Sequence, residues 1–373
     1  MPAADRFSRK PGTYENVIGQ TIRAAKPLSY LGFLDFSRLR IAASSRAASL
    51  QDIHLLAVTA LDVILPRTLL NPADPARPLE PQHSSPSPFE GGAAWKVAML
   101  KLLERNIAVV GERLVLLSPP ETDIPGHFRN VTRDTAEHHQ FVREMQRLRG
   151  SVYVSEGNVR RDQLTLDGLH ATPEDARSWH LVMTDGHGHV TSCAWYLEHE
   201  NTVSIQNLRV RTCPLARVDQ WREPLIGALQ SELANARRNR LRYAEVGGWA
   251  VAKERRCTSE GLLLALGAYG LCRILGGALG LTTANVKHSS SSILRRLGGS
   301  YLEFQGQVIP SYFDSRYNAD IELLRFDSRR PAPKYSGLIA KLQERLATVP
   351  VFAAEPGRLV RWTPGEGPQP LAA

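Results

Sequence analysis

Apolar and polar residues follow regular periods along parts of the chain, and each period predicts a type of element. Between residues 49 and 65, apolar side chains recur at helical spacing until Pro66, which predicts an amphipathic helix. A second helix is predicted from residue 93 to 105, and RLVLLS, residues 113 to 118, predicts a short buried strand. Residues 1 to 46 keep no sustained period and are interpreted as an irregular arm.

The pattern becomes more regular after residue 131. Asp134 followed by Glu137 indicates the start of a helix, and the apolar face that follows predicts a helix that ends near Gly150. An antiparallel meander of three strands is predicted over SWHLVMTD, HVTSCAWYLEHE and TVSIQNLRV, with the turn GHG between the first two.

Strands and helices alternate in the following part of the chain. A long helix is predicted from its cap at Asp219 to Asn239, and another from Ser259 to Leu275, with the strand YAEVGGWAVA between them. A strand, a short helix and a strand are then predicted over LGLTTANV, SSSILRRLGG and SYLEFQG. This order of elements predicts an α+β domain with a mixed sheet.

Composition indicates where the chain divides. Residues 71 to 92, NPADPARPLEPQHSSPSPFEGG, hold six prolines among Ser and Gly, so they predict an exposed linker. We therefore expect a helical N-terminal extension over residues 1 to 70, then this linker, a main domain over 93 to 330, and a C-terminal helix and tail over 331 to 373.

Overall composition is that of a soluble globular protein, with 43% hydrophobic and 22% charged residues. No apolar run is long enough for a membrane span and the N-terminus lacks a signal peptide, so a cytoplasmic location is expected. The four cysteines form no CxxC, which argues against a zinc site or a disulfide framework. The net charge of +9 suits nucleic acid, anionic lipid or an acidic protein, but only 8 of 46 basic residues are lysine, so genomic base composition is an equal explanation.

Candidate chemistry concentrates in EVGGWAVAKERRCTSEG, residues 245 to 261. Glycines weaken a strand unless a ligand or another backbone comes close. Strand alternation predicts that Glu245, Gly247 and Trp249 share one face, with a slot beside the carboxylate. Arg255 and Arg256 then precede a helix N-terminus, which is a favourable place for a phosphate. A solvated basic loop would give the same pattern, so both interpretations stay open.

From about Asp134 to Gly306 the order of elements resembles the GNAT acyltransferases. Within that superfamily, the closer resemblance is to acyl-homoserine lactone synthases and long-chain N-acyl amino acid synthases. It is carried by MQRLRGSVYV, WHLVMTDGHGHVTSCAW, GGWAV, ILRRLGG and SYFDSRYNADIELLRFDSR. Glu245 matches the glutamate of the ExxR pattern of lactone synthases, but Gly248 stands in place of its arginine, and Trp195 replaces another family arginine.

The resemblance implies a GNAT-like mixed, mostly antiparallel sheet flanked by helices, in which two strands splay apart around the acyl donor. It implies Glu245 as the base that takes a proton from the attacking amine, with a structural ion pair to Arg149 as the alternative. His288 or Ser289 is expected as the acid, because the tyrosine that many GNAT enzymes use is absent, and a helix cap is the alternative role of this serine-rich stretch. Cofactor-binding residues are expected at Val251, Arg255, Arg256, Ser259 and Gly261, and substrate-binding residues at Arg149, Gly247, Gly248 and Trp249, with no metal ligands.

The sequence thus predicts an N-acyltransferase that moves a long acyl group from an acyl carrier protein or coenzyme A thioester to the amine of an amino acid or similar small molecule. No permanently bound cofactor is expected, and the basic charge suits an acidic acyl carrier protein as partner. The alternatives are an acyl-homoserine lactone-type autoinducer synthase and a non-catalytic GNAT-fold module that binds nucleic acid or an acyl carrier. Nucleic acid is not the expected partner, because aromatic and basic residues do not interleave. For the N-terminal helices, covering an acyl tunnel, dimerisation and peripheral membrane contact all stay open.

Overall fold

The protein is seen in a computed structural model. It describes residues 114–256, 258–287 and 290–355, together with two strands at 360–363 and 366–370. The predicted N-terminal extension, the Pro-rich linker, the helix expected at 93 to 105 and His288 lie outside the described residues.

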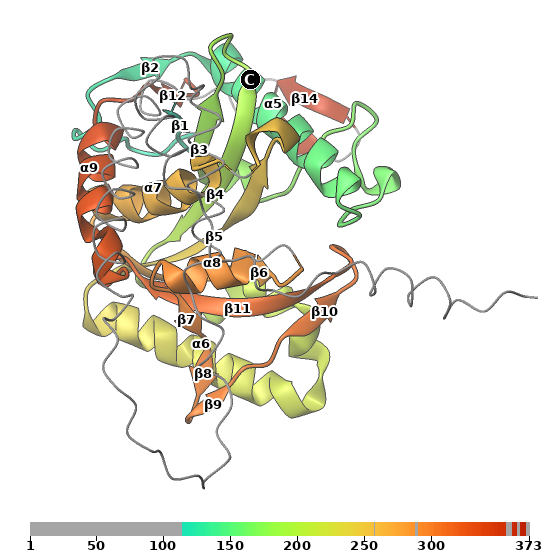
Figure 1. The fold of residues 1–373 in the computed structure, drawn as a ribbon, viewed down its shortest axis with the longest axis vertical. Helices are drawn as coiled ribbons and strands as arrows, with labels where there is room; N and C mark the ends of the chain where they lie inside the picture. Colours follow the sequence, from blue (N-terminus) through green and yellow to red (C-terminus); the bar gives the residue numbers. More distant parts are fainter. Residues whose placement is uncertain (1–113, 257, 288–289, 356–359, 364–365, 371–373) are drawn as a thin grey trace, which may run out of the picture. The chain divides into compact units, whose positions relative to one another are not determined.

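A ten-stranded mixed sheet organises the described residues (Figure 1). Its strands are β1 (Leu114–Leu117), β2 (Val131–Arg133), β3 (Trp179–Thr184), β4 (Val190–His199), β5 (Arg242–Val251), β6 (Ala278–Asn285), β7 (Ser300–Tyr301), β10 (Tyr312–Asp314), β11 (Ala319–Asp327) and β12 (Val351–Ala353). They lie in the order β10-β11-β6-β5-β4-β3-β1-β12-β2, with β7 beside β11. The pairs β5–β6, β1–β12 and β12–β2 are parallel and the other pairs are antiparallel, so the predicted α+β class with a mostly antiparallel sheet is confirmed.

Helices and short strand pairs complete the described part. The α-helices are α5 (Thr135–Ser155), α6 (Asp219–Arg238), α7 (Glu260–Ile274), α8 (Ser290–Arg296) and α9 (Ser336–Leu346). The 3₁₀ helices are η1 (Arg161–Gln163), η2 (Asp175–Arg177), η3 (Ile205–Asn207), η4 (Arg209–Thr212), η5 (Pro214–Arg217), η6 (Lys253–Arg255) and η7 (Pro333–Tyr335). Two further strand pairs are β8 (Glu303–Phe304) with β9 (Gln307–Val308), and β13 (Val360–Thr363) with β14 (Glu366–Pro370). Among the described helices, none has the length and apolar character needed to cross a bilayer.

Helices cover both faces of the sheet. Helices α7 and α9 pack against each other on one face, while α5 and α6 cover the other (Figure 1). Successive residues of one strand point to opposite faces. Accordingly, Leu116 and Leu181 join the core under α7 and α9, whereas their neighbours Leu117 and Val182 join the core under α5. A third core, under α6, is separate from the core under α5.

Helix α5 starts as predicted but ends later. The Asp134 carboxylate accepts hydrogen bonds from the backbone N–H groups of Ala136 and Glu137, which caps the helix. The helix then continues past Gly150 to Ser155. A Cβ atom at Gly150 would lie 2.5 Å from the carbonyl oxygen of Gly168, so this glycine allows a close backbone approach and does not end the helix.

The strand predicted over TVSIQNLRV is wrong, since this segment forms η3 and η4. Its apolar side chains Leu208 and Val210 bury themselves in the core under α6. The backbone N–H groups of Arg209 and Val210 donate to the carboxylate of Glu245. This carboxylate therefore accepts hydrogen bonds that the backbone of a neighbouring strand would accept in a sheet. The strand that follows β4 in the meander is therefore β5.

Strands β5 and β6 pair along only part of their lengths. Their register runs from Arg242 opposite Ala278 to Val246 opposite Thr282, and both strands then continue to their ends without further pairing to each other. Strand β4 remains paired with β5 as far as Val251. The sheet is thus open between the ends of β5 and β6, which is the splay that the family resemblance implies.

Candidate functional site

A cavity of about 760 Å³ occupies the opening between β5 and β6. Its wall includes the unpaired ends of both strands and side chains from both faces of the sheet. Small-molecule sites commonly have volumes of about 300 to 1,000 Å³. The cavity is therefore large enough for a substrate, and the break in the sheet connects its two sides.

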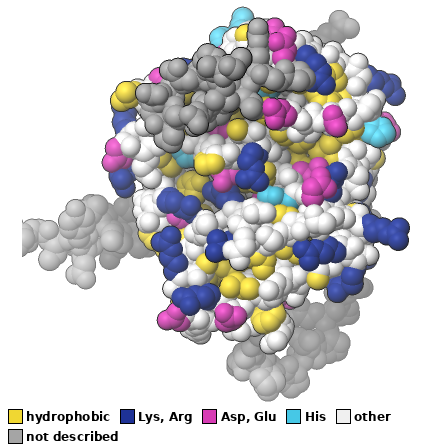
Figure 2. Space-filling model, turned by 180° about the vertical axis from the view of Figure 1, so that it is seen from behind, with side chains coloured by type: hydrophobic (Ala, Val, Ile, Leu, Met, Phe, Trp, Pro, Cys, Tyr) yellow, Lys and Arg dark blue, Asp and Glu magenta, His cyan; other side chains and the backbone are white. Residues whose placement is uncertain are grey.

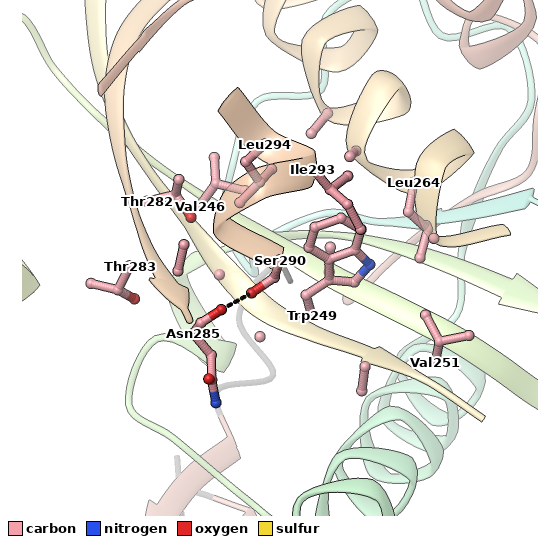
Figure 3. A pocket seen from close by; sticks show the side chains of 18 of the residues that line it. Val246, Trp249, Val251, Leu264, Thr282, Thr283, Asn285, Ser290, Ile293 and Leu294 are labelled. Carbon is pink, nitrogen blue, oxygen red and sulfur yellow. Dashed lines mark hydrogen bonds between the residues drawn. The ribbon is translucent and has the colours of Figure 1, made fainter. Parts of the chain in front are cut away.

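One side of the cavity, which we call the apolar lobe, is lined by Val246, Leu264, Ala265, Ala268, Leu294 and Phe326. Figure 3 shows Val246 and Trp249 from β5 beside Leu264 of α7 and Ile293 and Leu294 of α8. Helix α7 turns small side chains toward this space, because Gly261, Ala265 and Ala268 recur at helical spacing and all line the cavity. The lobe suits an apolar chain.

The opposite side, which we call the polar lobe, is lined by Arg149, Tyr153, His170, Trp195, Arg209 and Tyr317. These residues come from α5, the loop after it, β4, η4 and the turn between β10 and β11. The Tyr153 ring lies 5.1 Å from the His170 ring and 6.4 Å from the Tyr317 ring, between ring centroids. The lobe combines two guanidinium groups with aromatic walls.

Arg149 is fully buried, and it forms an ion pair with Asp175 and not with Glu245. Its Nη2 donates to Oδ2 of Asp175 at 2.5 Å and to the carbonyl oxygen of His170 at 2.7 Å. Burial opposes its charge, but the Asp175 carboxylate outweighs this and raises the pKa of Arg149. Nε and Nη1 have no hydrogen-bond partner among the described residues. The guanidinium is thus half satisfied by the protein, and it lines the polar lobe.

Burial also keeps His170 uncharged. The loss of solvent and the nearby Arg149 charge lower the pKa of His170 to about 4. Its Nδ1 has no partner among the described residues. Near neutral pH the polar lobe therefore contains a neutral imidazole beside two cations.

Glu245 does not line the cavity. Its Oε2 accepts hydrogen bonds from Nε2 of His199 at 3.0 Å and from the backbone N–H of Arg209 at 2.8 Å. Its Oε1 accepts from the backbone N–H of Val210 at 2.9 Å. The carboxylate is buried and held by the protein, and the expected slot beside it is absent from the described geometry.

The prediction that Trp249 shares a strand face with Glu245 and Gly247 is wrong. Opposite β4, the register passes from Gly247 paired with Trp195 to Ala250 paired with Cys193, which leaves a bulge in β5. Gly248 has a φ of 63° there, in the left-handed region that favours glycine. Because the bulge adds a residue, Trp249 turns to the α7 face and packs against that core, away from Glu245.

The space expected over the two glycines is filled by a side chain. A Cβ atom at Gly247 would lie 2.5 Å from Cζ2 of Trp195, and one at Gly248 would lie 2.1 Å from its Cδ1. The indole of Trp195 therefore lies directly against the glycine pair. Gly247 and Gly248 admit this ring where their Cβ atoms would stand, and both still line the cavity.

The predicted donor-binding residues come together at the start of α7. Nη1 of Arg255 lies 3.7 Å from Oε1 of Glu260, and Nη2 of Arg256 lies 2.7 Å from Oε1 of Glu156. Both arginines have a carboxylate neighbour and remain partly exposed. The cavity wall includes Val251, Arg255, Arg256, Ser259 and Gly261.

Tyr153 and Trp195 of the polar lobe lie in segments that carry the family resemblance but were not predicted as site residues. Three more residues of the lobe were missed from the sequence: His170, Arg209 and Tyr317. His170 lies in an irregular loop, where no periodic pattern marks it. Arg209 lies in a segment that was predicted to be a strand but forms η4. Tyr317 belongs to the family-like segment 311 to 329, whose Tyr, Asp and Arg residues had no assigned mechanism. Of these three, a signal existed only for Tyr317, through that resemblance.

No family model matches the chain, and no curated protein matches it. Solved structures do match. A CoA-dependent acyl-homoserine lactone synthase, BjaI, has 14% identity and a TM-score of 0.40, over 66% of this chain and 95% of that chain. FeeM, an N-acyl amino acid synthase from uncultured soil microbes, has 13% identity and a TM-score of 0.34, over 53% and 88%. An acyl-CoA N-acyltransferase from Pseudomonas aeruginosa has 14% identity and a TM-score of 0.30, over 52% and 96%.

The sheet itself agrees with the resemblance that the sequence indicates: it is mixed, mostly antiparallel, covered by helices on both faces and open between β5 and β6. Within the described ranges, no group of three His, Cys, Asp or Glu side chains is suited to hold a metal ion.

Positive charge is not gathered into one patch on the face that Figure 2 shows. Lys and Arg side chains lie scattered there among acidic and uncharged ones. A strong nucleic-acid footprint is typically a continuous basic patch or stripe. The described residues visible on this face therefore form no continuous basic surface.

Proposed function

We propose that the protein is an N-acyltransferase that moves an acyl group from a thioester to the amine of a small molecule. The observation that supports this most is the cavity in the sheet opening, with an apolar lobe toward α7 and a polar lobe toward α5. A thioester carbon placed between β5 and β6 would be reached from both lobes. The thioester donor and the amine acceptor would then approach from opposite faces of the sheet.

The donor would lie on the α7 side. Its acyl chain would occupy the apolar lobe, and the phosphates of coenzyme A or of a carrier-protein arm would lie near Arg255, Arg256 and the first turn of α7. Exposed N–H groups of β5 beyond its pairing with β6 would stabilise the oxyanion that forms when the amine attacks. We retain His288 as the proposed acid for the departing thiolate.

The acceptor would lie in the polar lobe. Its ammonium must lose a proton before the nitrogen can attack the thioester carbon. The burial and positive charge that lower the pKa of His170 to about 4 would also lower the pKa of an amine bound beside it. The neutral amine then attacks the thioester carbon, and its nitrogen gives up a further proton as the carbon–sulfur bond breaks. The departing thiolate takes up a proton, so the products are an amide and a thiol.

The test is product analysis by mass spectrometry. Purified protein is mixed with acyl-CoA and acyl carrier protein donors of several chain lengths, together with the twenty amino acids and simple amines. We expect N-acyl products with at least one donor class. In Ala265→Trp, a variant that fills the apolar lobe, products should be lost while the protein stays folded. If the wild type gives no product with any donor and binds neither donor class, the proposal is wrong.

A further inference from the structure

The buried Glu245 carboxylate holds a piece of backbone that carries a residue of the polar lobe. Its acceptor positions are taken by two successive backbone N–H groups, at Arg209 and Val210, and by the His199 ring. The Glu245 side chain is 6% exposed, and it is not among the residues that line the cavity. A carboxylate in this setting anchors η4 at its first turn.

The residue anchored in this way is held at the wall of the cavity by contacts on several sides. The Arg209 guanidinium lies over the Trp195 ring, with 5.7 Å from Cζ to the ring centroid. Its Nη2 donates to the Tyr317 hydroxyl at 2.9 Å, and its Nε lies 3.3 Å from Oε1 of Glu174. Each of these contacts depends on where η4 places the Arg209 backbone, and Glu245 determines that placement.

We propose that Glu245 is a positioning residue: it fixes η4 so that the Arg209 guanidinium stands in the polar lobe and binds an anionic or carbonyl oxygen of the acceptor. Arg209 lies on the face of the sheet opposite to α7, where the donor is proposed to bind. The assignment of the bound group to the acceptor rests on the proposed function. The role of Glu245 toward Arg209 rests only on the contacts above.

The experiment compares Glu245→Gln, Arg209→Gln and the double variant in steady-state kinetics over a range of pH. The amide introduced by Glu245→Gln cannot accept at both positions, because one of its terminal atoms is a donor. The matched control is Arg211→Gln, which removes an exposed arginine from the same short helix and lies outside the cavity wall. Melting temperatures show whether each variant is folded.

We expect both single variants to raise the acceptor KM about tenfold or more, which is the effect of losing a hydrogen bond to a charged group. The donor KM and the shape of the pH profile should stay unchanged, and Arg211→Gln should match the wild type. The acceptor KM of the double variant should be no higher than that of the more impaired single variant, because both changes break one chain of contacts.

Other kinetic results would overturn the assignment. If Glu245→Gln lowers kcat, leaves the acceptor KM unchanged and removes the acidic limb of the pH profile, Glu245 is a base. If Arg209→Gln raises the donor KM instead, the guanidinium binds the donor. If Glu245→Gln does not fold, Arg209→Gln still decides whether Arg209 binds the acceptor.

One measurement separates this inference from the proposed function. A crystal structure of Glu245→Gln shows whether η4 moves and whether Arg209 leaves Trp195, even if the wild type makes no acylated product. A displaced Arg209 supports positioning by Glu245. An unchanged η4 refutes it.

Discussion

Replacing Gly248 with alanine tests whether the bulge in β5 needs a glycine because the Trp195 indole packs against it. The new Cβ atom would meet Cδ1 of Trp195 at 2.1 Å, Nε1 of Trp195 at 2.4 Å and Nη1 of Arg149 at 3.0 Å. Contacts below 3.0 Å require the indole or the backbone to move. Trp195 is buried and has the Arg209 guanidinium over its ring, so a shift of the indole would disturb that contact.

Two costs add in this variant. A side chain in the left-handed region costs about 1 to 2 kcal/mol per residue, and the φ of 63° places Gly248 there. Pressing a methyl group against the indole costs about 1 to 3 kcal/mol more. The free energy of unfolding should therefore fall by about 2 to 5 kcal/mol in total.

Equilibrium unfolding in urea, followed by circular dichroism, measures this loss. The control is Gly157→Ala, because Gly157 also has a positive φ, of 70°, but a Cβ atom there would meet nothing within 4 Å. It should lose only the backbone cost of about 1 to 2 kcal/mol. Trp195→Leu in the Gly248→Ala background should restore part of the stability, which a double-mutant cycle reveals.

Equal losses in Gly248→Ala and Gly157→Ala would refute the reasoning. In that case the indole would not be pressed against the bulge, and the turning of Trp249 toward α7 would need another cause.

Three further predictions concern stability, pH and the donor. Asp175→Asn leaves the Arg149 charge buried without its carboxylate, so urea unfolding should show a loss of about 3 to 5 kcal/mol, against about 1 or less for the exposed Asp167→Asn. Burial lowers the pKa of His138 from 6.5 to about 4, so the unfolded chain takes up a proton first as pH falls. Stability should therefore decrease from pH 6.5 toward 4, and a His138→Gln variant that keeps the same decrease would contradict this. Ala268→Phe should lower the catalytic efficiency for long acyl donors at least tenfold relative to short ones in a competition assay; equal losses at all lengths would place the acyl chain elsewhere.

The sequence alone determined those parts of the protein that depend on neighbouring residues. The cap at Asp134, the strands β3 to β5 and the helix α7 follow from side-chain period and capping chemistry, which act within a few positions. The residues between Val251 and Gly261 that line the cavity were grouped from the sequence for the same reason, because one strand-to-helix junction brings them together.

Only the tertiary structure decided the polar lobe and the face to which each β5 side chain turns. The bulge at Gly248 appears only when β5 is paired with β4, and it moves Trp249 to the α7 face. Arg209 meets Tyr317 across 108 positions of sequence. Glu245 meets the backbone of Arg209 across 36 positions. Pairing register, burial and long-range hydrogen bonds set these positions, and no local pattern of residues encodes them.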